Sequence, residues 1–398
     1  MEELKRYSTL KTILSKIASF FHYLNGKPGF RSFVSSLMCI VLGLLFGLIL
    51  MLCVDPMGGF KGLWVLISSG FKLNYIPTVI YKATPMMLAG VAIAFSFKLG
   101  LFNIGITGQV TAGAFFSILV GLAGGNWFAC LLVGMLGGAF MGFIPGFLKA
   151  KFNVNEVLSG IMLNWVLYYI IGIIGNLWIP KSFKYRMNAS ELEILPITAR
   201  MPSMGLDKVL PGVSVGLIIA ILLVLIIQIV LNKTTFGMEL KMTGSNKHAS
   251  KYAGVNQVKS IVLALTISGA LAGICGYMSF ADPVSPIRFT WDSNSNTLLS
   301  NGFDGIAVAL IAQNSPIGCI FSAILLNLID SAQNALKNVS SSYNTHYVEL
   351  IRSIIIYGAA ISSFFNYFIK KYNDKHGKHA FYNNLFKKKV VEENKEGK

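Results

Sequence analysis

Long apolar runs constrain this chain more than any other feature of its sequence. A helix needs about 20 apolar residues to cross the hydrocarbon core of a bilayer, and about ten stretches approach that length or form shorter apolar segments. These stretches are 33–54, 76–97, 108–124, 126–148, 157–179, 212–231, 260–280, 303–314, 316–335 and 348–369. We therefore expect an all-α fold, a polytopic membrane helical bundle with about ten transmembrane segments.

The chain is strongly basic, and the distribution of the charge is informative. Hydrophobic residues make up 54% of the sequence and charged residues 13%, so a water-soluble domain could not cover its surface with polar groups. In a soluble protein the net charge of +17 would indicate nucleic acid as a partner. Here we expect no nucleic-acid partner, because the Lys and Arg residues gather in two tails and one loop, as is typical of cytoplasmic segments.

These patterns divide the chain into a membrane domain with two tails. We expect basic cytoplasmic tails at 1–32 and 370–398, on either side of a transmembrane domain at 33–369. Within that domain, 232–259 should be a cytoplasmic loop, and the proline-rich stretch 180–211 should be an outer loop. The chain is thus expected in the cell membrane as a multi-pass protein with both termini in the cytoplasm.

A polar, glycine-rich break interrupts the apolar sequence at 98–109. It contains Asn103 and Gln109 among three glycines. Irregular backbone at membrane depth is tolerated only against protein or a wet cavity. The break therefore either lines a solute pathway or forms a tight turn between two helices.

A second break, at 301–310, and two other places carry polar side chains within apolar segments. Asp304 is either a functional intramembrane carboxylate or a residue that stabilises the start of a short helix. Asn164 needs a partner within the bundle, either another helix or a solute. Glu349 and Arg352 lie three residues apart, on one helix face, and are predicted to pair with each other.

Two similar segments indicate a possible internal repeat. The stretch 84–95 resembles 268–280, and a glycine-rich polar break and another apolar segment follow each of them. In the topology proposed above the two copies cross the membrane in opposite directions, as in the inverted repeats of many transporters. Similarity between small-residue helices also arises from composition alone.

The polar segment 237–255 in the cytoplasmic loop is too organised for a simple connector. Asn246 is placed to cap a short helix, and Gly254 is placed to end it. Small side chains on this helix offer a face that could fit a groove on a partner protein. These side chains belong to Ala249, Ser250 and Ala253.

The sequence contains few signs of catalytic chemistry. No Gly-x-x-x-x-Gly-Lys phosphate loop is present, so the chain should not hydrolyse ATP itself. The histidines and cysteines have no metal-ligand spacing and no arrangement with a nucleophile. We therefore expect no enzyme activity, no catalytic residues, no metal and no cofactor.

The segment 237–255 resembles the coupling segment of bacterial ABC importer permeases in the branched-chain amino acid, ribose and nucleoside branch. The resemblance extends from about residue 33 to 370, and Ser250 and Lys241 stand where alanine and arginine are commoner. By this resemblance, the residues that couple to an ATPase are Thr243, Gly244, Asn246, Ala249, Ser250, Ala253 and Gly254.

The segments 102–109, 156–164 and 302–307 look most like the permeases of nucleoside systems that use a basic-membrane-protein-type lipoprotein receptor. The resemblance implies a substrate pathway formed by Phe102, Asn103, Gly105, Gln109, Asn164, Phe303 and Asp304. Contacts with the solute should be weak, because tight binding in a pathway slows release.

The resemblance implies that the chain is one subunit of an import complex. It would translocate a nucleoside, or a related simple sugar, driven by ATP hydrolysis in a separate ABC ATPase subunit. Its other partners would be a second, often non-identical permease, an extracytoplasmic substrate-binding lipoprotein and membrane lipid. The alternative is a secondary transporter or channel for a small polar solute, which would use an intramembrane ion site or charge pair. The coupling-like segment argues against that alternative.

Overall fold

The computed structural model describes residues 28–177, 195–208, 213–281, 300–340, 343 and 345–361, and the regular elements in these ranges are all helices. The first half contains α2 (Pro28–Val54), α3 (Gly59–Ser68), η1 (Ser69–Phe71), α4 (Ile76–Phe97), α5 (Ile106–Leu122), α6 (Trp127–Phe152) and α7 (Glu156–Leu177). The second half contains η2 (Ile197–Ala199), η3 (Leu206–Lys208), α9 (Val215–Lys233), α10 (Thr235–Ser245), α11 (Lys247–Tyr252), α12 (Gln257–Phe280), α13 (Asn301–Ile311), α14 (Pro316–Asp330), α15 (Ala332–Lys337) and α16 (Thr345–Ala360).

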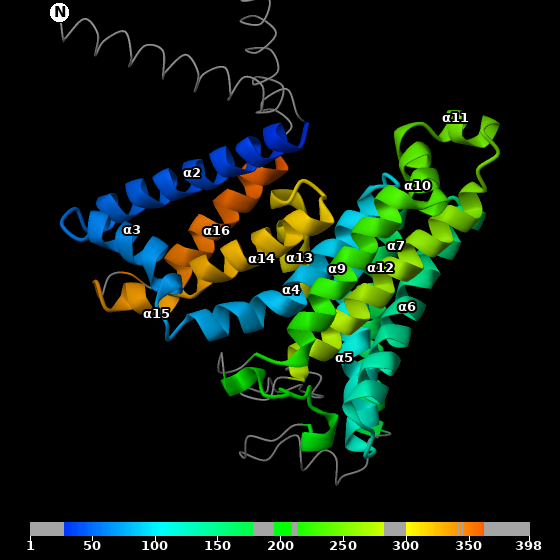
Figure 1. The fold of residues 1–398 in the computed structure, drawn as a ribbon, viewed down its shortest axis with the longest axis horizontal. Coiled ribbons are helices and arrows are strands. Elements are labelled where there is room, and N and C mark those ends of the chain that lie inside the picture. The colour runs from blue at the N-terminus through cyan, green and yellow to red at the C-terminus, as the bar shows by residue number, and fades with distance from the viewer. Residues whose placement is uncertain are drawn as a thin grey trace, which may run out of the picture. The chain divides into compact units, whose positions relative to one another are not determined.

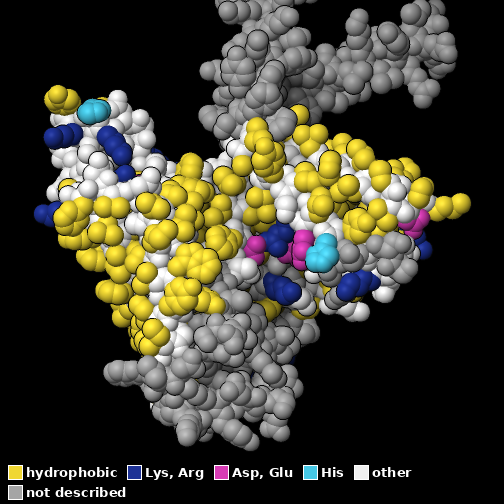
Figure 2. Space-filling model, turned by 180° about the vertical axis from the view of Figure 1, so that it is seen from behind, with side chains coloured by type: hydrophobic (Ala, Val, Ile, Leu, Met, Phe, Trp, Pro, Cys, Tyr) yellow, Lys and Arg dark blue, Asp and Glu magenta, His cyan; other side chains and the backbone are white. Residues whose placement is uncertain are grey.

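The helices confirm a polytopic membrane bundle. In the described residues, seven helical segments are long and apolar enough to cross a membrane, and α5 and α13 are shorter apolar helices. Where it is described, each apolar run predicted from the sequence is largely helical; the short run becomes α13, and 316–335 is divided between α14 and α15. Hydrophobic side chains cover large areas of the visible surface of the described part in Figure 2, as expected for a protein whose solvent is lipid.

Most of the predicted loops and tails lie outside the described residues. This applies to nearly all of the tail 1–32, to the whole of the tail 370–398 and to much of the outer loop 180–211. By contacts the chain forms two compact units, Met1–Phe46 with Ser353–Lys398 and Gly47–Arg352. In the first unit the Cys39 thiol on α2 donates a hydrogen bond to the carbonyl of Gly358 on α16, at 3.1 Å.

Within the second unit, α4 and α12 are the most buried of the spans. In the most apolar 18 residues of each, 78% of α4 and 72% of α12 is buried, whereas in the other spans the buried share is at most 44%. The helices that follow them are exchanged: α12 packs against α5 and α6, and α4 packs against α13 and α14 (Figure 1). The internal repeat of 84–95 and 268–280 stays a prediction.

A seam of glycines joins α6 to α12 at close range. A methyl group added at Gly273 would overlap the carbonyl oxygen of Gly134, and one added at Gly138 would overlap that of Gly269. The pair Gly142 and Gly269 is similarly close. Small residues let helix backbones approach in a membrane, where van der Waals packing replaces the hydrophobic effect as the driving force.

Candidate functional site

The first break lies between the end of α4 and the start of α5, and its amide side chains bond to each other. Asn103 Nδ2 donates to Gln109 Oε1 at 2.8 Å, and Gln109 Nε2 donates to Asn103 Oδ1 at 3.2 Å. Asn103 Nδ2 also donates to Ser268 Oγ on α12 at 2.9 Å, and this hydroxyl donates to the Ala92 carbonyl on α4 at 2.7 Å. The buried amide pair thus ties α4, α5 and α12 together at the break.

Asn164 on α7 finds its partner in the backbone of the same break. Its Oδ1 accepts a hydrogen bond from Gly108 N at 2.9 Å, and its Nδ2 donates to the Ile104 carbonyl at 3.2 Å. The helix α7 and the break approach so closely that a methyl group added at Gly160 would lie 2.7 Å from Gly105 N. The sequence predicted either another helix or a solute as the partner of Asn164, and in the structure its amide bonds to the protein backbone.

The second break packs directly against the first. A methyl group added at Gly302 would overlap the backbone of Thr107 on α5, and one added at Gly305 would lie 2.5 Å from the Ala89 side chain on α4. Thr107 is fully buried, and within the described part of the chain its hydroxyl has no hydrogen-bond partner. Phe303, by contrast, is half exposed. Segments about 200 residues apart in the sequence therefore meet at one place in the bundle.

Asp304 is part of an ion-pair cluster that links α13, α14 and α16. The Arg352 guanidinium donates to Asp304 Oδ1 and, at 3.0 Å, to Asp330 Oδ2. The predicted pairing of Arg352 with Glu349 is therefore wrong, and the exposed Glu349 side chain instead contacts His346 at 3.1 Å. Spacing along one helix does not decide the partner, because carboxylates from two other helices reach the guanidinium in a less solvated position.

The local structure of the segment 237–255 confirms the predicted helix boundaries. Asn246 Oδ1 accepts a hydrogen bond from Ala249 N at 3.0 Å, which caps α11. Gly254 has a φ of 80°, the left-handed conformation that ends a helix. The orientation predicted for Ser250 is wrong: the residue is buried, and its hydroxyl accepts from Gln257 Nε2 at 2.9 Å. Ser250 thus holds α11 against the start of α12 rather than facing outward.

The exposed face of this segment and its inward face contain different residues. Ala249 and Ala253 are exposed, and Tyr252 is 94% exposed. Thr243 is buried, and Gly244 lies against the turn that follows α4. The helices α10 and α11 lie at one end of the bundle (Figure 1).

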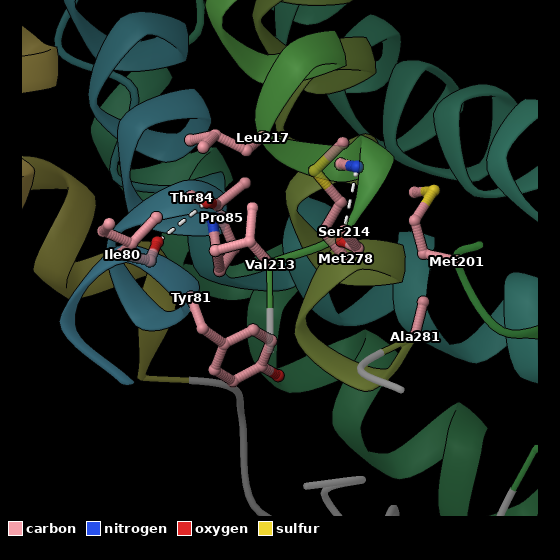
Figure 3. A pocket seen from close by; sticks show the side chains of 11 residues that line it. Ile80, Tyr81, Thr84, Pro85, Met201, Val213, Ser214, Leu217, Met278 and Ala281 are labelled. Atoms are coloured by element: carbon pink, nitrogen blue, oxygen red, sulfur yellow. Dashed lines mark hydrogen bonds between the residues drawn. The ribbon is translucent and has the colours of Figure 1, made fainter. Parts of the chain in front are cut away.

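A small cavity lies among α4, the start of α9 and the end of α12. Its volume is about 20 Å³, enough for a water molecule. In Figure 3 Tyr81 and Thr84 of α4 lie on one side of the cavity and Met278 of α12 on the other, beside Ser214, which caps the start of α9. The complete lining consists of Ile80, Tyr81, Thr84, Pro85, Met201, Val213, Ser214, Gly216, Leu217, Met278 and Ala281.

Comparison with known proteins decides the family. The family described as "Branched-chain amino acid transport system / permease component" matches residues 75–360, which include both breaks and α10–α11. The chain belongs to this permease family. It is 33% identical to the guanosine ABC transporter permease protein NupP of Bacillus subtilis, over 82% of this chain and 92% of the relative. It is 30% identical to the nucleoside ABC transporter permease protein NupB of Lactococcus lactis, over 83% and 91% of the two chains. It is also 26% identical to the glucose ABC transporter permease protein TsgB13 of Haloferax volcanii, over 78% and 82%.

Membership of the permease family makes this chain a multi-pass membrane component of a transport system. The relatives include two permeases from each of two organisms. Besides NupP and NupB, the chain is similar to NupQ of Bacillus subtilis, at 25% identity, and to NupC of Lactococcus lactis, at 26%. In the described residues, no group of three or more His, Cys, Asp and Glu side chains could hold a metal ion.

The structure brings together most of the pathway residues predicted for this permease. Asn103, Gly105, Gln109 and Asn164 surround the first break, and the second break lies beside them. Sequence reasoning missed Ser268 and Asp330, whose contacts come from distant helices. A serine and an acidic residue inside apolar segments are the signals that could have drawn attention to them.

Proposed function

We propose that this chain is the membrane-spanning permease subunit of an ABC importer that carries a nucleoside into the cytoplasm. The observation that carries the proposal is its similarity to permeases named for guanosine and nucleoside transport, over more than nine tenths of their length. ATP hydrolysis would take place in separate ATPase subunits, and a receptor lipoprotein would deliver the solute from outside. The paired relatives favour a second, non-identical permease as the other half of the pathway.

The segment α10–α11 is proposed to receive the ATPase on the cytoplasmic side. Ala249, Tyr252 and Ala253 are its exposed residues, and lysines flank them at Lys247 and Lys251. An exposed tyrosine beside small residues is typical of a contact that anchors in a groove. In this topology both termini of the chain are cytoplasmic, in agreement with the excess of basic residues in the two tails.

The two breaks are proposed to border the solute pathway. Asn103, Gln109 and Asn164 have their amide atoms bonded to protein, so in this conformation they brace the break rather than offer free groups. The cavity beside Tyr81 lies towards the opposite end of α4 from the break, where the solute would enter. Its volume of about 20 Å³ is far below that of ordinary ligand pockets, so helices must move before a solute can pass.

Uptake of labelled nucleosides and ribose by cells that express the complete transporter tests this function. The informative variant is Gly254→Asp, which places a charged side chain at the end of α11. Gly205→Asp is its matched control, because both glycines have a positive φ, of 80° and 86°, and nothing within 4 Å of an added Cβ.

We expect nucleoside uptake in the wild type, loss of uptake in Gly254→Asp and near-normal uptake in Gly205→Asp, at equal membrane abundance. Ribose uptake without nucleoside uptake would change the proposed solute to a sugar. Normal nucleoside uptake in Gly254→Asp would contradict the ATPase-coupling role of the segment and favour a secondary transporter.

A further inference from the structure

We infer that Gly244 is a positioning residue that transmits movement of α10–α11 to the first helix break, through backbone contact with the turn 98–101. The inference rests on the proposed function, in which an ATPase moves this segment. This contact is separate from the chain connections that join α10–α11 to α9 and α12.

The contact between Gly244 and the turn is backbone against backbone. A methyl group added at Gly244 would overlap the Lys98 carbonyl oxygen and would lie 2.9 Å from the Leu99 carbonyl carbon and 3.1 Å from Gly100 N. From the other side, a Cβ on Gly100 would lie 3.5 Å from the Gly244 carbonyl oxygen. No flexible side chain separates the two segments at this point, so a displacement of one must move the other.

The rest of the inward face of α10 supports the same contact. Leu240 is fully buried, and Thr243 is 1% exposed. The Phe236 ring lies 6.4 Å, between centroids, from the ring of Phe95 near the end of α4. The helix α10 thus packs against α9 and α12 and also touches the end of α4 through Phe236, while most of α11 is exposed. Packed interfaces of this kind shift as units rather than deform continuously.

The turn leads directly into the network of the first break. Asn103 follows it by two residues and is bonded to Gln109 on α5 and to Ser268 on α12. A further step along α5, Thr107 meets Gly302 of the second break. A push at Gly244 thus reaches the first break through backbone contact and the hydrogen bonds of Asn103, and the second break through the packing of Thr107 against Gly302.

The test compares Gly244→Ala with Ser245→Ala in the complete transporter, reconstituted with its ATPase, second permease and receptor. Ser245 is the neighbour of Gly244 and is exposed as Gly244 is, and its hydroxyl donates within α10, to the Met242 carbonyl at 3.0 Å. ATP hydrolysis in the absence of receptor and guanosine uptake in its presence are measured on the same preparations. A misfolded variant would lose both activities, whereas a variant with a broken transmission would lose uptake and keep hydrolysis.

We expect Gly244→Ala to hydrolyse ATP at near the wild-type rate while uptake per ATP falls about tenfold, within the usual range of coupling between sites. Ser245→Ala should keep the wild-type ratio. An unchanged ratio in Gly244→Ala would overturn the inference. A wild-type complex that imports no nucleoside would instead contradict the proposed function.

A second measurement on the wild-type complex needs no variant to fold. Hydrogen exchange is compared between the nucleotide-free complex and the complex held with an ATP analogue. We expect the protection of backbone amides at 98–105 to change together with that of α10–α11. Changes at the ends of α9 and α12 without any change at 98–105 would overturn the inference.

Discussion

Removing the cation of the Arg352 cluster should destabilise the fold strongly. The guanidinium side chain is 16% exposed, and the carboxylates that it joins, on Asp304 and Asp330, are 24% and 18% exposed. Arg352→Met would leave two poorly solvated negative charges without a partner. Loss of one partner from a buried ion pair usually costs 3–5 kcal/mol, and the residual exposure of the three groups favours the lower end, about 3 kcal/mol.

Arg352→Lys should be milder. A single ammonium group cannot reproduce the planar fork that serves both carboxylates at once. We expect it to keep one ion pair and to lose one charged hydrogen bond, at a cost of about 1.5 kcal/mol. The triple variant Asp304→Asn, Asp330→Asn and Arg352→Met should recover most of the stability lost in Arg352→Met, because no unpaired charge remains.

The assay is the free energy of unfolding in mixed micelles, with membrane abundance as a second readout. Glu349→Gln is the matched control, because this exposed carboxylate lies on the same helix as Arg352 but contacts His346. It should change stability by less than about 0.5 kcal/mol. Wild-type stability in Arg352→Met, or a triple variant no more stable than the single one, would refute the reasoning.

Two further predictions concern contacts within the bundle. Asn164→Ala should lower the free energy of unfolding by about 1–3 kcal/mol, because it leaves the buried Gly108 N–H without an acceptor. Thermal unfolding of the purified protein measures this loss. An unchanged midpoint would show that the hydrogen bond contributes nothing to stability. Gly273→Ala should sharply lower the amount of folded protein in the membrane, because the new methyl group overlaps the Gly134 carbonyl oxygen on α6. Gly358→Ala is its control, since an added Cβ there meets nothing closer than 3.5 Å; equal abundance of the two variants would contradict the packing argument.

The local features of the fold were predictable from the sequence. Hydropathy located the membrane helices, and glycines and polar residues located both breaks. The cap at Asn246 and the end of α11 at Gly254 were also predicted, because capping and helix termination depend on neighbouring backbone groups. The membership of the permease family followed from the same segments.

The partners of the polar side chains were not predictable in the same way. Arg352 was assigned to a neighbour on its own helix, but its carboxylates come from α13 and α14. Ser250 was assigned to an outward face, but Gln257 turns it inward. In both cases a residue from another helix competes for the same polar group, and helical spacing contains no information about that competitor.

The sequence by itself determined that this protein is a helical membrane protein, because each helix must satisfy its own backbone hydrogen bonds and expose apolar side chains to lipid. Only the tertiary structure decided which helices exchange partners around α4 and α12, and that the two breaks meet beside Thr107. The physical reason is that apolar helices attract one another with little selectivity. Their arrangement depends on where glycines let backbones approach and where amides, such as those of Asn103 and Gln109, find each other.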